Sequence, residues 1–291
     1  MNIIIFGAGA SGRMLYDEAS RRGNVIAFAD NDPNKWGQTI CGIPIYEPQK
    51  CLLSMEYDTV IVAAFCGLNE IRQQCLELGI PAEKIITSAF ETSKESRKMF
   101  LKNMASLLNS YESDADVAEA GVYQGEFAQW INYYFPQRTL HLFDTFAGFD
   151  AKDLSVEAEN NYSEELEGHF KETSVELVMS RMPHPKRCIV HKGYFPDTAA
   201  HINRKFCFVN LDLDLYLPIY RGLHYFKNHM TTQGVILIHD YYSSGYKGSR
   251  AAVEQFTAEC NGIIRKLPIG DDASILLCGE WDKLIPNPVA G

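Results

Sequence analysis

Residues 119–125 read Glu119-Ala120-Gly121-Val122-Tyr123-Gln124-Gly125, and they close an apolar run of strand length. Gly121 and Gly125 carry no Cβ atom, so the backbone between them can approach a ligand and a helix closely. Asp144 ends the next apolar run, 23 residues after Gly121, where a carboxylate can accept both hydroxyl groups of a ribose. The motif therefore predicts a nucleoside ligand at the edge of a parallel sheet. The alternative is that Glu119 and Asp144 only cap helices at strand ends.

Apolar runs alternate with stretches of helical period on both sides of this motif, which is typical of α/β domains. The pattern occurs twice, so we predict two Rossmann-like domains, residues 1–92 and 93–291. The last two strands flank only Asp271-Asp272, so the second sheet should end in an antiparallel hairpin. Its seven strands are expected at Val117–Gly121, Thr139–Asp144, Arg187–Gly193, Phe206–Asp212, Gly234–Asp240, Gly262–Gly270 and Ala273–Gly279. Five strands are expected in the first domain, at Asn2–Gly7, Asn24–Asp30, Ile43–Pro48, Thr59–Ala64 and Lys84–Phe90.

Two polar stretches interrupt the alternation of strands and helices. The first, residues 91–98, predicts a partly helical linker within residues 91–105. The second, Asp150 to Thr173, is acidic and too long for an ordinary connection. It predicts a lid or a segment that faces the substrate.

The first domain begins with a glycine-rich loop, Gly7-Ala8-Gly9-Ala10-Ser11-Gly12, directly after an apolar strand. Asp30 ends the next strand, so the loop matches the dinucleotide-binding fingerprint in its usual context. We predict a nucleotide or nucleotide-sugar site at Gly7, Gly9, Gly12 and Asp30, with a scaffold or docking domain as the alternative. The stretches 30–37 and 41–45 resemble the N-terminal domains of bacterial sugar acyltransferases, which implies a setting of glycan assembly.

Composition excludes several classes of partner. Against 37 acidic residues there are 27 Lys and Arg, so the formal charge of −10 repels nucleic acid and anionic lipid. The N-terminus lacks the basic and small-residue features of a signal peptide, so we expect a cytoplasmic protein. The eight cysteines form no C-x-x-C pair and are expected to be reduced.

Two further strands end in polar side chains. Asp212 and Asp214 follow one of them, and His239-Asp240 follows the next. Because the carboxyl ends of parallel strands share one edge of a sheet, Asp212, His239 and Asp240 are expected to converge on a cation. The alternative is that some of these residues cap helices or pair with Arg250 or Lys247.

Together these motifs resemble the macrocin-type sugar O-methyltransferases of macrolide biosynthesis, over about residues 110–280. The resemblance implies S-adenosylmethionine and a divalent metal as cofactors. The segments that support it are 121–128, 142–149, Gly193-Tyr194-Phe195-Pro196-Asp197-Thr198, Leu211-Asp212-Leu213-Asp214-Leu215-Tyr216 and 250–256. It implies a cofactor site at Glu119, Gly121, Tyr123, Gly125, Asp144, Thr145 and Phe146, and metal ligands at Asp212, His239 and Asp240.

The chain departs from the family at His239, where the family has a second acid next to Asp240. The resemblance implies magnesium, but imidazole suits transition metals better than Mg²⁺. The departure therefore leaves two questions open: which metal binds, and whether the site has kept a metal at all. We predict Asp214 or His239 as the base that takes the acceptor proton. Tyr241 and Arg250 are predicted to contact the substrate.

These observations predict an S-adenosylmethionine-dependent O-methyltransferase that acts on a hydroxyl group of a sugar, nucleotide-sugar or glycoside. Two alternatives stay open. Asp212-Leu213-Asp214 also fits the Asp-x-Asp signature of metal-dependent glycosyltransferases, and a domain that has lost its metal would be a non-catalytic nucleotide-sugar-binding protein. The expected partners are a small-molecule substrate and further copies of the chain in a homo-oligomer, with no nucleic acid and no membrane.

Overall fold

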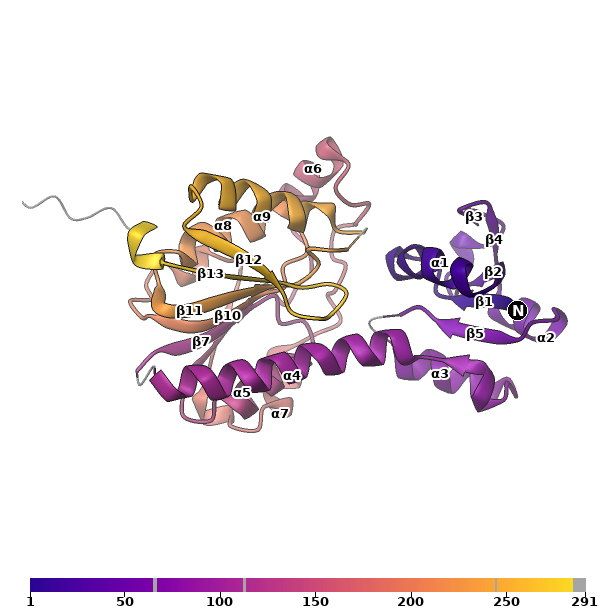
Figure 1. The fold of residues 1–291 in the computed structure, drawn as a ribbon, viewed down its shortest axis with the longest axis horizontal. Coiled ribbons are helices and arrows are strands. Elements are labelled where there is room, and N and C mark those ends of the chain that lie inside the picture. Colours follow the sequence, from indigo (N-terminus) through magenta and orange to yellow (C-terminus); the bar gives the residue numbers. More distant parts are fainter. Residues whose placement is uncertain (65–66, 112–113, 244, 285–291) are drawn as a thin grey trace, which may run out of the picture. The chain divides into compact units, whose positions relative to one another are not determined.

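The structure, a computed structural model, describes residues 1–64, 67–111, 114–243 and 245–284 (Figure 1). The chain forms two compact α/β units: an N-terminal unit, residues 1–95, and a C-terminal unit, made of most residues from 96 onward. Helix α4 (Ser88–Tyr111) is continuous through the segment predicted as a linker, and the predicted domain limit at 92/93 falls inside it. Among the described helices, none combines the length and the apolar character needed to cross a bilayer.

The N-terminal unit has six strands in its described residues, 1–64 and 67–95, in the order β3-β4-β2-β1-β5-β6. The prediction of five strands was wrong because Cys41 and Gly42, both with positive φ, fold the short strand β3 back onto β4. The last predicted strand was too long, since Ser88 already begins α4. The strands are β1 (Asn2–Phe6), β2 (Asn24–Ala29), β3 (Thr39–Ile40), β4 (Ile43–Tyr46), β5 (Thr59–Val62) and β6 (Ile85–Ile86). The other helices are α1 (Ala10–Arg22), α2 (Pro48–Ser54) and α3 (Leu68–Glu77).

The C-terminal unit contains the predicted sheet: seven strands within its described residues, in the order β12-β13-β11-β10-β7-β8-β9. Strands β7 to β11 pair in parallel, and β12 and β13 form the predicted antiparallel hairpin, with β13 antiparallel to β11. The strands are β7 (Asp116–Ala120), β8 (Leu140–Asp144), β9 (Cys188–Lys192), β10 (Phe206–Leu211), β11 (Met230–Ile238), β12 (Ile264–Pro268) and β13 (Ile275–Gly279). The helices are α5 (Ala128–Tyr134), α6 (Ala151–Asn160), α7 (Val175–Arg181), α8 (Tyr216–Phe226) and α9 (Lys247–Glu259).

Both faces of this sheet are buried, as a doubly wound fold requires. Helices α4, α5 and α7 cover one face, and α8 and α9 cover the other (Figure 1). On α4 the buried face is formed by Leu101, Ala105 and Leu108, at the spacing of successive helical turns. Because each fully buried leucine contributes about 1.5–3 kcal/mol, this face holds α4 on the sheet from Leu101 onward.

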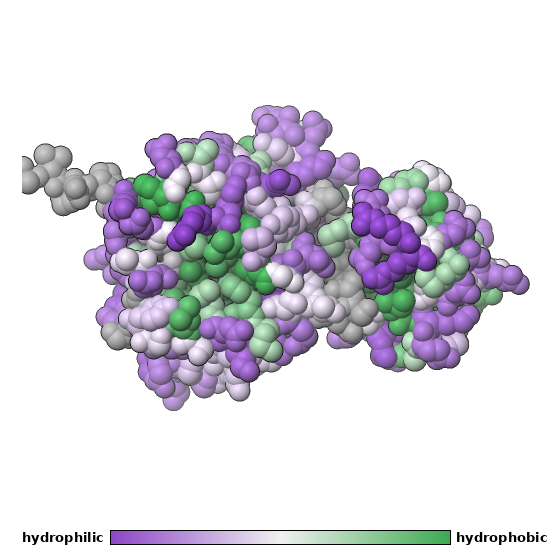
Figure 2. Space-filling model, viewed as in Figure 1, coloured by the Kyte–Doolittle hydropathy of each residue, from purple (hydrophilic) through white to green (hydrophobic). Residues whose placement is uncertain are grey.

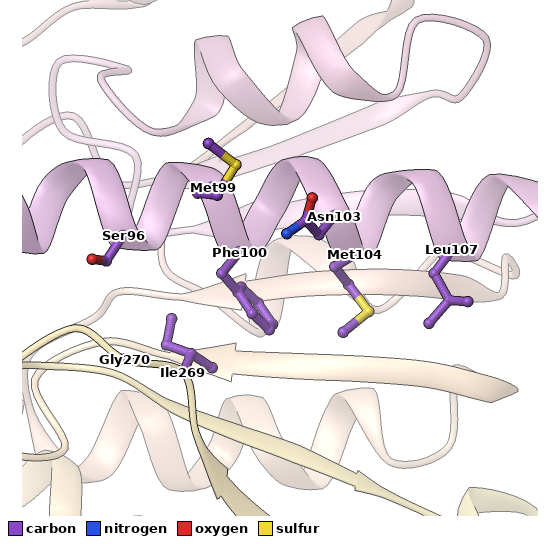
Figure 3. Close-up of a pocket in the computed structure, with 8 residues that line it drawn as sticks. All are labelled: Ser96, Met99, Phe100, Asn103, Met104, Leu107, Ile269 and Gly270. Atoms are coloured by element: carbon purple, nitrogen blue, oxygen red, sulfur yellow. The ribbon is translucent and has the colours of Figure 1, made fainter.

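Beside its buried face α4 carries further apolar side chains, of which Phe100 and Met104 are partly buried against the same core. Figure 2 shows hydrophobic surface gathered on one side of the C-terminal unit. A groove of about 450 Å³ runs between α4 and the turn after β12. Phe100, Met104 and Leu107 lie on one side of the helix there, with Ile269 across from Phe100 (Figure 3). The described lining includes no charged side chain, so this groove is distinct in character from the polar edge of the sheet.

The cysteines in the described residues are free thiols. Burial raises the pKa of Cys51, Cys75 and Cys188 to about 11, so these thiols stay protonated and pack as small apolar groups. Cys66 lies outside the described residues.

Candidate active site

Glu119 is the penultimate residue of β7, lies in the interior of the C-terminal unit and is 2% exposed. The Asn210 side-chain amide donates a hydrogen bond of 2.8 Å to Oε1 of Glu119. Oε2 is buried and has no hydrogen-bond partner in the part of the chain that the structure describes. Burial, and then the neighbouring Asp212 carboxylate, raise the pKa of Glu119 well above its usual value. A buried carboxylate oxygen without a donor is costly, and the ammonium group of a ligand would satisfy it.

Asp144, at the end of β8, holds the glycine-rich loop in place. Its Oδ2 accepts the backbone N–H groups of Val122 and Tyr123, at 2.7 and 2.9 Å. Its Oδ1 accepts the N–H of Phe146 at 2.7 Å. A carboxylate offers about four acceptor positions, so one position on Oδ1 remains. Asp144 therefore keeps an acceptor position for a ribose hydroxyl group, and the predicted contact with both hydroxyls stays a prediction.

Gly121 brings this loop against the end of the neighbouring strand β10. A Cβ atom at position 121 would lie 1.8 Å from the carbonyl oxygen of Asp212, so only glycine fits. The N–H of Asp212 in turn donates to the Ala120 carbonyl oxygen at 2.8 Å. The close crossing of these two backbones places the cofactor loop beside the predicted metal ligands.

Asp212, His239 and Asp240 converge as predicted, and one ligand atom of each lies within 4.8 Å of the others. Nδ1 of His239 lies 3.1 Å from Oδ1 of Asp212 and 2.7 Å from Oδ2 of Asp240. Burial and the Arg97 cation lower the pKa of His239, but the two carboxylates outweigh them and raise it to about 10. At neutral pH the protonated imidazole therefore bridges two carboxylates.

Asp214 lies beside this cluster. Burial raises the pKa of Asp214 well above its usual value, and the carboxylates of Asp240 and Asp212 raise it further. The backbone of Asp214 has a φ of 60° and that of Asp240 a φ of 58°, in the left-handed region. Tyr123 and Phe146, in the predicted cofactor site, have φ values of 47° and 53°. Such conformations are costly for residues with a side chain and gather at functional sites, which supports this edge as the active site.

Arg97 is a site residue that the sequence reading missed. One nitrogen of its guanidinium group donates to Oδ1 of Asn210 at 2.9 Å and to Oδ2 of Asp212 at 3.1 Å. The signal was a cation four residues before Leu101, on the face of α4 that is buried. It was overlooked because residues 91–98 were interpreted as a linker.

The acidic insert between β8 and β9 reaches both parts of the site. Thr173 donates to the Tyr123 carbonyl oxygen in the glycine-rich loop. Glu165 accepts a hydrogen bond of 2.8 Å from the Tyr246 hydroxyl and pairs with His169. The Asp214 and Glu165 carboxylates contribute to raising the pKa of Tyr246, after burial. Glu165 and Tyr246 were also missed, because neither belongs to a motif of fixed spacing.

Three predicted residues have partners in the protein itself. The Tyr241 hydroxyl donates to Glu254, and the Arg250 guanidinium lies 5.4 Å from the centre of the Tyr241 ring. Thr145 donates to the Gly148 carbonyl oxygen at 2.9 Å, which shapes the turn after β8. These contacts show structural roles for the three side chains, and their ligand contacts stay predictions.

The glycine-rich loop of the N-terminal unit is built in the same way as that of the C-terminal unit. Asp30 accepts the N–H groups of Ala8 at 2.7 Å and Asp32 at 2.8 Å, and it pairs with Lys35 at 3.1 Å. A Cβ atom at Gly12 would lie 2.0 Å from the Gly7 carbonyl oxygen, whereas one at Gly9 would meet nothing within 4 Å. The open space at Gly9 is on the N-cap of α1, where the fingerprint places a phosphate.

Two known families match separate parts of the chain. Residues 1–86 match the family described as C2185-like, N-terminal, and residues 89–273 match macrocin O-methyltransferase (TylF). No curated protein matches the chain. The second match favours a methyltransferase over an Asp-x-Asp glycosyltransferase.

Solved structures share the fold of the C-terminal unit. The O-methyltransferase NovP is 17% identical with a TM-score of 0.51, over 63% of this chain and 79% of NovP. CalS11, a calicheamicin methyltransferase, is 15% identical with a TM-score of 0.51, over 78% of this chain and 96% of CalS11. At these identities the likeness shows the fold alone. The family match covers more than half of the sequence, and the chain therefore belongs to the macrocin O-methyltransferase (TylF) family.

Proposed function

We propose that this methyltransferase uses S-adenosylmethionine and a divalent cation to methylate a hydroxyl group of a sugar, nucleotide-sugar or glycoside. The observation that supports it most strongly is the buried Oε2 of Glu119 beside the glycine-rich loop, which has no hydrogen-bond partner among the described residues. Bound S-adenosylmethionine supplies an electrophilic methyl group and carries an ammonium group. Glu119 is placed to accept that ammonium group, and the remaining position on Asp144 to accept one ribose hydroxyl.

The cluster of Asp212, His239 and Asp240 fits a divalent cation by its chemistry. Two carboxylates and an imidazole converge at one edge of the sheet, next to the cofactor loop. When bound, the cation would supply Lewis acidity to the acceptor oxygen. The imidazole favours a transition metal over magnesium.

Of the two predicted bases, Asp214 is the one that the geometry supports. His239 bridges Asp212 and Asp240 through Nδ1 and is itself a proposed metal ligand, so we assign it to the metal site and not to proton transfer. Asp214 lies beside Asp240 at the same edge. We propose that Asp214 takes the proton while Tyr241 and Arg250 shape the acceptor side.

The proposed function is tested by titrating the protein calorimetrically with S-adenosylhomocysteine, with and without Mg²⁺ or Mn²⁺. NAD and a UDP-sugar serve as comparison ligands. We expect saturable binding of S-adenosylhomocysteine at one site. Absence of that binding, with heat from the UDP-sugar instead, would move the proposal to glycosyl transfer or nucleotide-sugar binding.

The acidic insert is proposed to act as a lid, because it contacts the cofactor loop and Tyr246 together. Binding of S-adenosylhomocysteine should order Tyr123 and Thr173, and should slow tryptic cleavage after Lys171 several-fold. Cleavage after the exposed Lys283 is the internal reference. Equal cleavage rates at Lys171 with and without ligand would contradict the lid.

The N-terminal unit is proposed to bind a nucleotide-sugar at Gly7, Gly9, Gly12 and Asp30. The substitution Gly9→Leu has room within the protein, since a Cβ atom there meets nothing within 4 Å. It should block an approaching phosphate, raise the apparent KM for the nucleotide-sugar, and leave the affinity for S-adenosylhomocysteine unchanged. An unchanged KM would make the unit a scaffold.

We also propose a cytoplasmic homo-oligomer without nucleic-acid or membrane partners. The support is the charge of −10, which repels polyanions and anionic lipid. Light scattering of the purified protein measures the oligomeric state, and a monomer mass would contradict this part of the proposal.

A further inference from the structure

Arg97 is the branch point of a hydrogen-bonded chain that runs through the whole active-site edge. The Arg97 side chain is 12% exposed, and its guanidinium group lies 4.0 Å from the centre of the Phe127 ring. The same nitrogen of Arg97 contacts Asn210 at 2.9 Å and Asp212 at 3.1 Å. One cation thus serves two different side chains.

One branch of the chain leads to the cofactor carboxyl. Arg97 donates to Oδ1 of Asn210, which turns the amide so that Nδ2 faces Glu119 and donates at 2.8 Å. Without Arg97 the buried amide could rotate by half a turn and place its oxygen against Glu119. Two acceptors would then face each other, and Glu119 could be stabilised only by protonation, which removes the charge that binds an ammonium group.

The other branch leads to the metal-ligand cluster. Arg97 occupies Oδ2 of Asp212, while Oδ1 faces His239. A cation that binds at Asp212 meets the positive charge of Arg97 at close range. Arg97 therefore stabilises the carboxylates of the cluster by itself and opposes a metal ion there, because like charges repel strongly at a poorly solvated site.

We propose that Arg97 is a positioning residue with opposite effects on the two sites: it orients Asn210 so that Glu119 can hold the cofactor ammonium group, and it acts as a built-in counter-ion that weakens the metal site. This inference rests on the proposed function. Arg97 lies on α4, outside the strand-end motifs, and through it this helix influences both cofactor binding and metal binding.

The test compares Arg97→Met with the wild type by direct binding. Calorimetry without metal should show about tenfold weaker binding of S-adenosylhomocysteine, the size expected for losing one hydrogen bond to a charged group. Titration with Mn²⁺ alone, followed by electron paramagnetic resonance, should show tighter binding. Opposite shifts cannot come from a general distortion, which would weaken both ligands.

Matched variants separate charge from orientation. Arg97→Lys should recover most of the affinity for S-adenosylhomocysteine, because both hydrogen bonds come from a single nitrogen. Lys98→Met removes a cation from the adjacent position of α4, where the Lys98 ammonium lies 4.0 Å from the centre of the Trp130 ring. It should leave both affinities unchanged.

Asn210→Ala tests the relay. It should weaken the binding of S-adenosylhomocysteine as much as Arg97→Met does and leave Mn²⁺ binding unchanged. In the double variant the affinity for S-adenosylhomocysteine should fall little further, because both substitutions remove the same Arg97–Asn210–Glu119 contact chain. Thermal unfolding of each variant confirms that it folds.

The inference is overturned if Arg97→Met binds S-adenosylhomocysteine as the wild type does, if Lys98→Met is equally impaired, or if Arg97→Met weakens both ligands. Failure of the wild type to bind S-adenosylhomocysteine would instead overturn the proposed function. The two failures are therefore distinguishable.

Discussion

Replacing Asp212 by alanine is expected to reduce methyl transfer more than about a hundredfold. Asp212 is the carboxylate on which His239 and Arg97 meet, and its loss removes the group that orients a cation and the acceptor hydroxyl. Positioning of reactants can contribute up to about 7–11 kcal/mol to catalysis, so even partial misplacement is severe. Initial rates with labelled S-adenosylmethionine measure the effect.

The same variant should bind S-adenosylhomocysteine with nearly the wild-type affinity, because Arg97 and Asn210 still orient Glu119. Asp212→Asn is the graded control, because it keeps an acceptor for Arg97 but removes the charge. Its activity should fall between that of the wild type and that of Asp212→Ala. Loss of cofactor affinity with retained turnover would reverse the roles assigned to Asp212 and Glu119.

Replacing Asp144 by alanine should weaken binding of S-adenosylhomocysteine at least about thirtyfold. Three backbone N–H groups lose an ionised acceptor, and each such hydrogen bond contributes about 1.5–3 kcal/mol. The glycine-rich loop at Val122 and Tyr123 and the turn at Phe146 would lose their conformation, together with the acceptor for a ribose hydroxyl. Calorimetry measures the affinity, and thermal unfolding measures the accompanying loss of stability.

The chain contains a matched control for this variant in its other unit. Asp30 similarly accepts the N–H of Ala8 in the first glycine-rich loop and the N–H of Asp32 after β2. Asp30→Ala should therefore cost stability but leave the affinity for S-adenosylhomocysteine unchanged. Equal loss of that affinity in both variants would mean that Asp144 acts through general stability and not through the cofactor loop.

The strand ends were the predictable part of this protein. Apolar runs mark the parallel strands, and parallel strands end at one edge, so the approach of Asp212 to His239 follows from topology alone. The antiparallel hairpin was also predicted, but its turn was wrong: β12 ends at Pro268 and β13 begins at Ile275, so the connection is longer than Asp271-Asp272. The short strand β3 could not be predicted in this way, because its two residues form no periodic pattern and depend on positive φ at Cys41 and Gly42.

Contacts between side chains of different elements could not be predicted from sequence patterns. Arg97 meets Asp212 over a separation of 115 residues, and Tyr246 meets Glu165 over 81. Neither pair has a fixed spacing, because each depends on how a helix or an insert packs on the sheet. The hydrogen bond from the Phe146 N–H to Oδ1 of Asp144 was likewise not given by any motif of fixed spacing.

Helix α4 also limits how this enzyme can be recombined with its relatives. Its first turns belong to the N-terminal unit, and Arg97 follows only two residues after that unit ends. A chimera joined after Tyr111 would keep every strand-end motif yet exchange the residue that meets Asn210 and Asp212. A crossover before Arg97 preserves the native pairing, so the modular boundary of the active site lies on the N-terminal side of this residue.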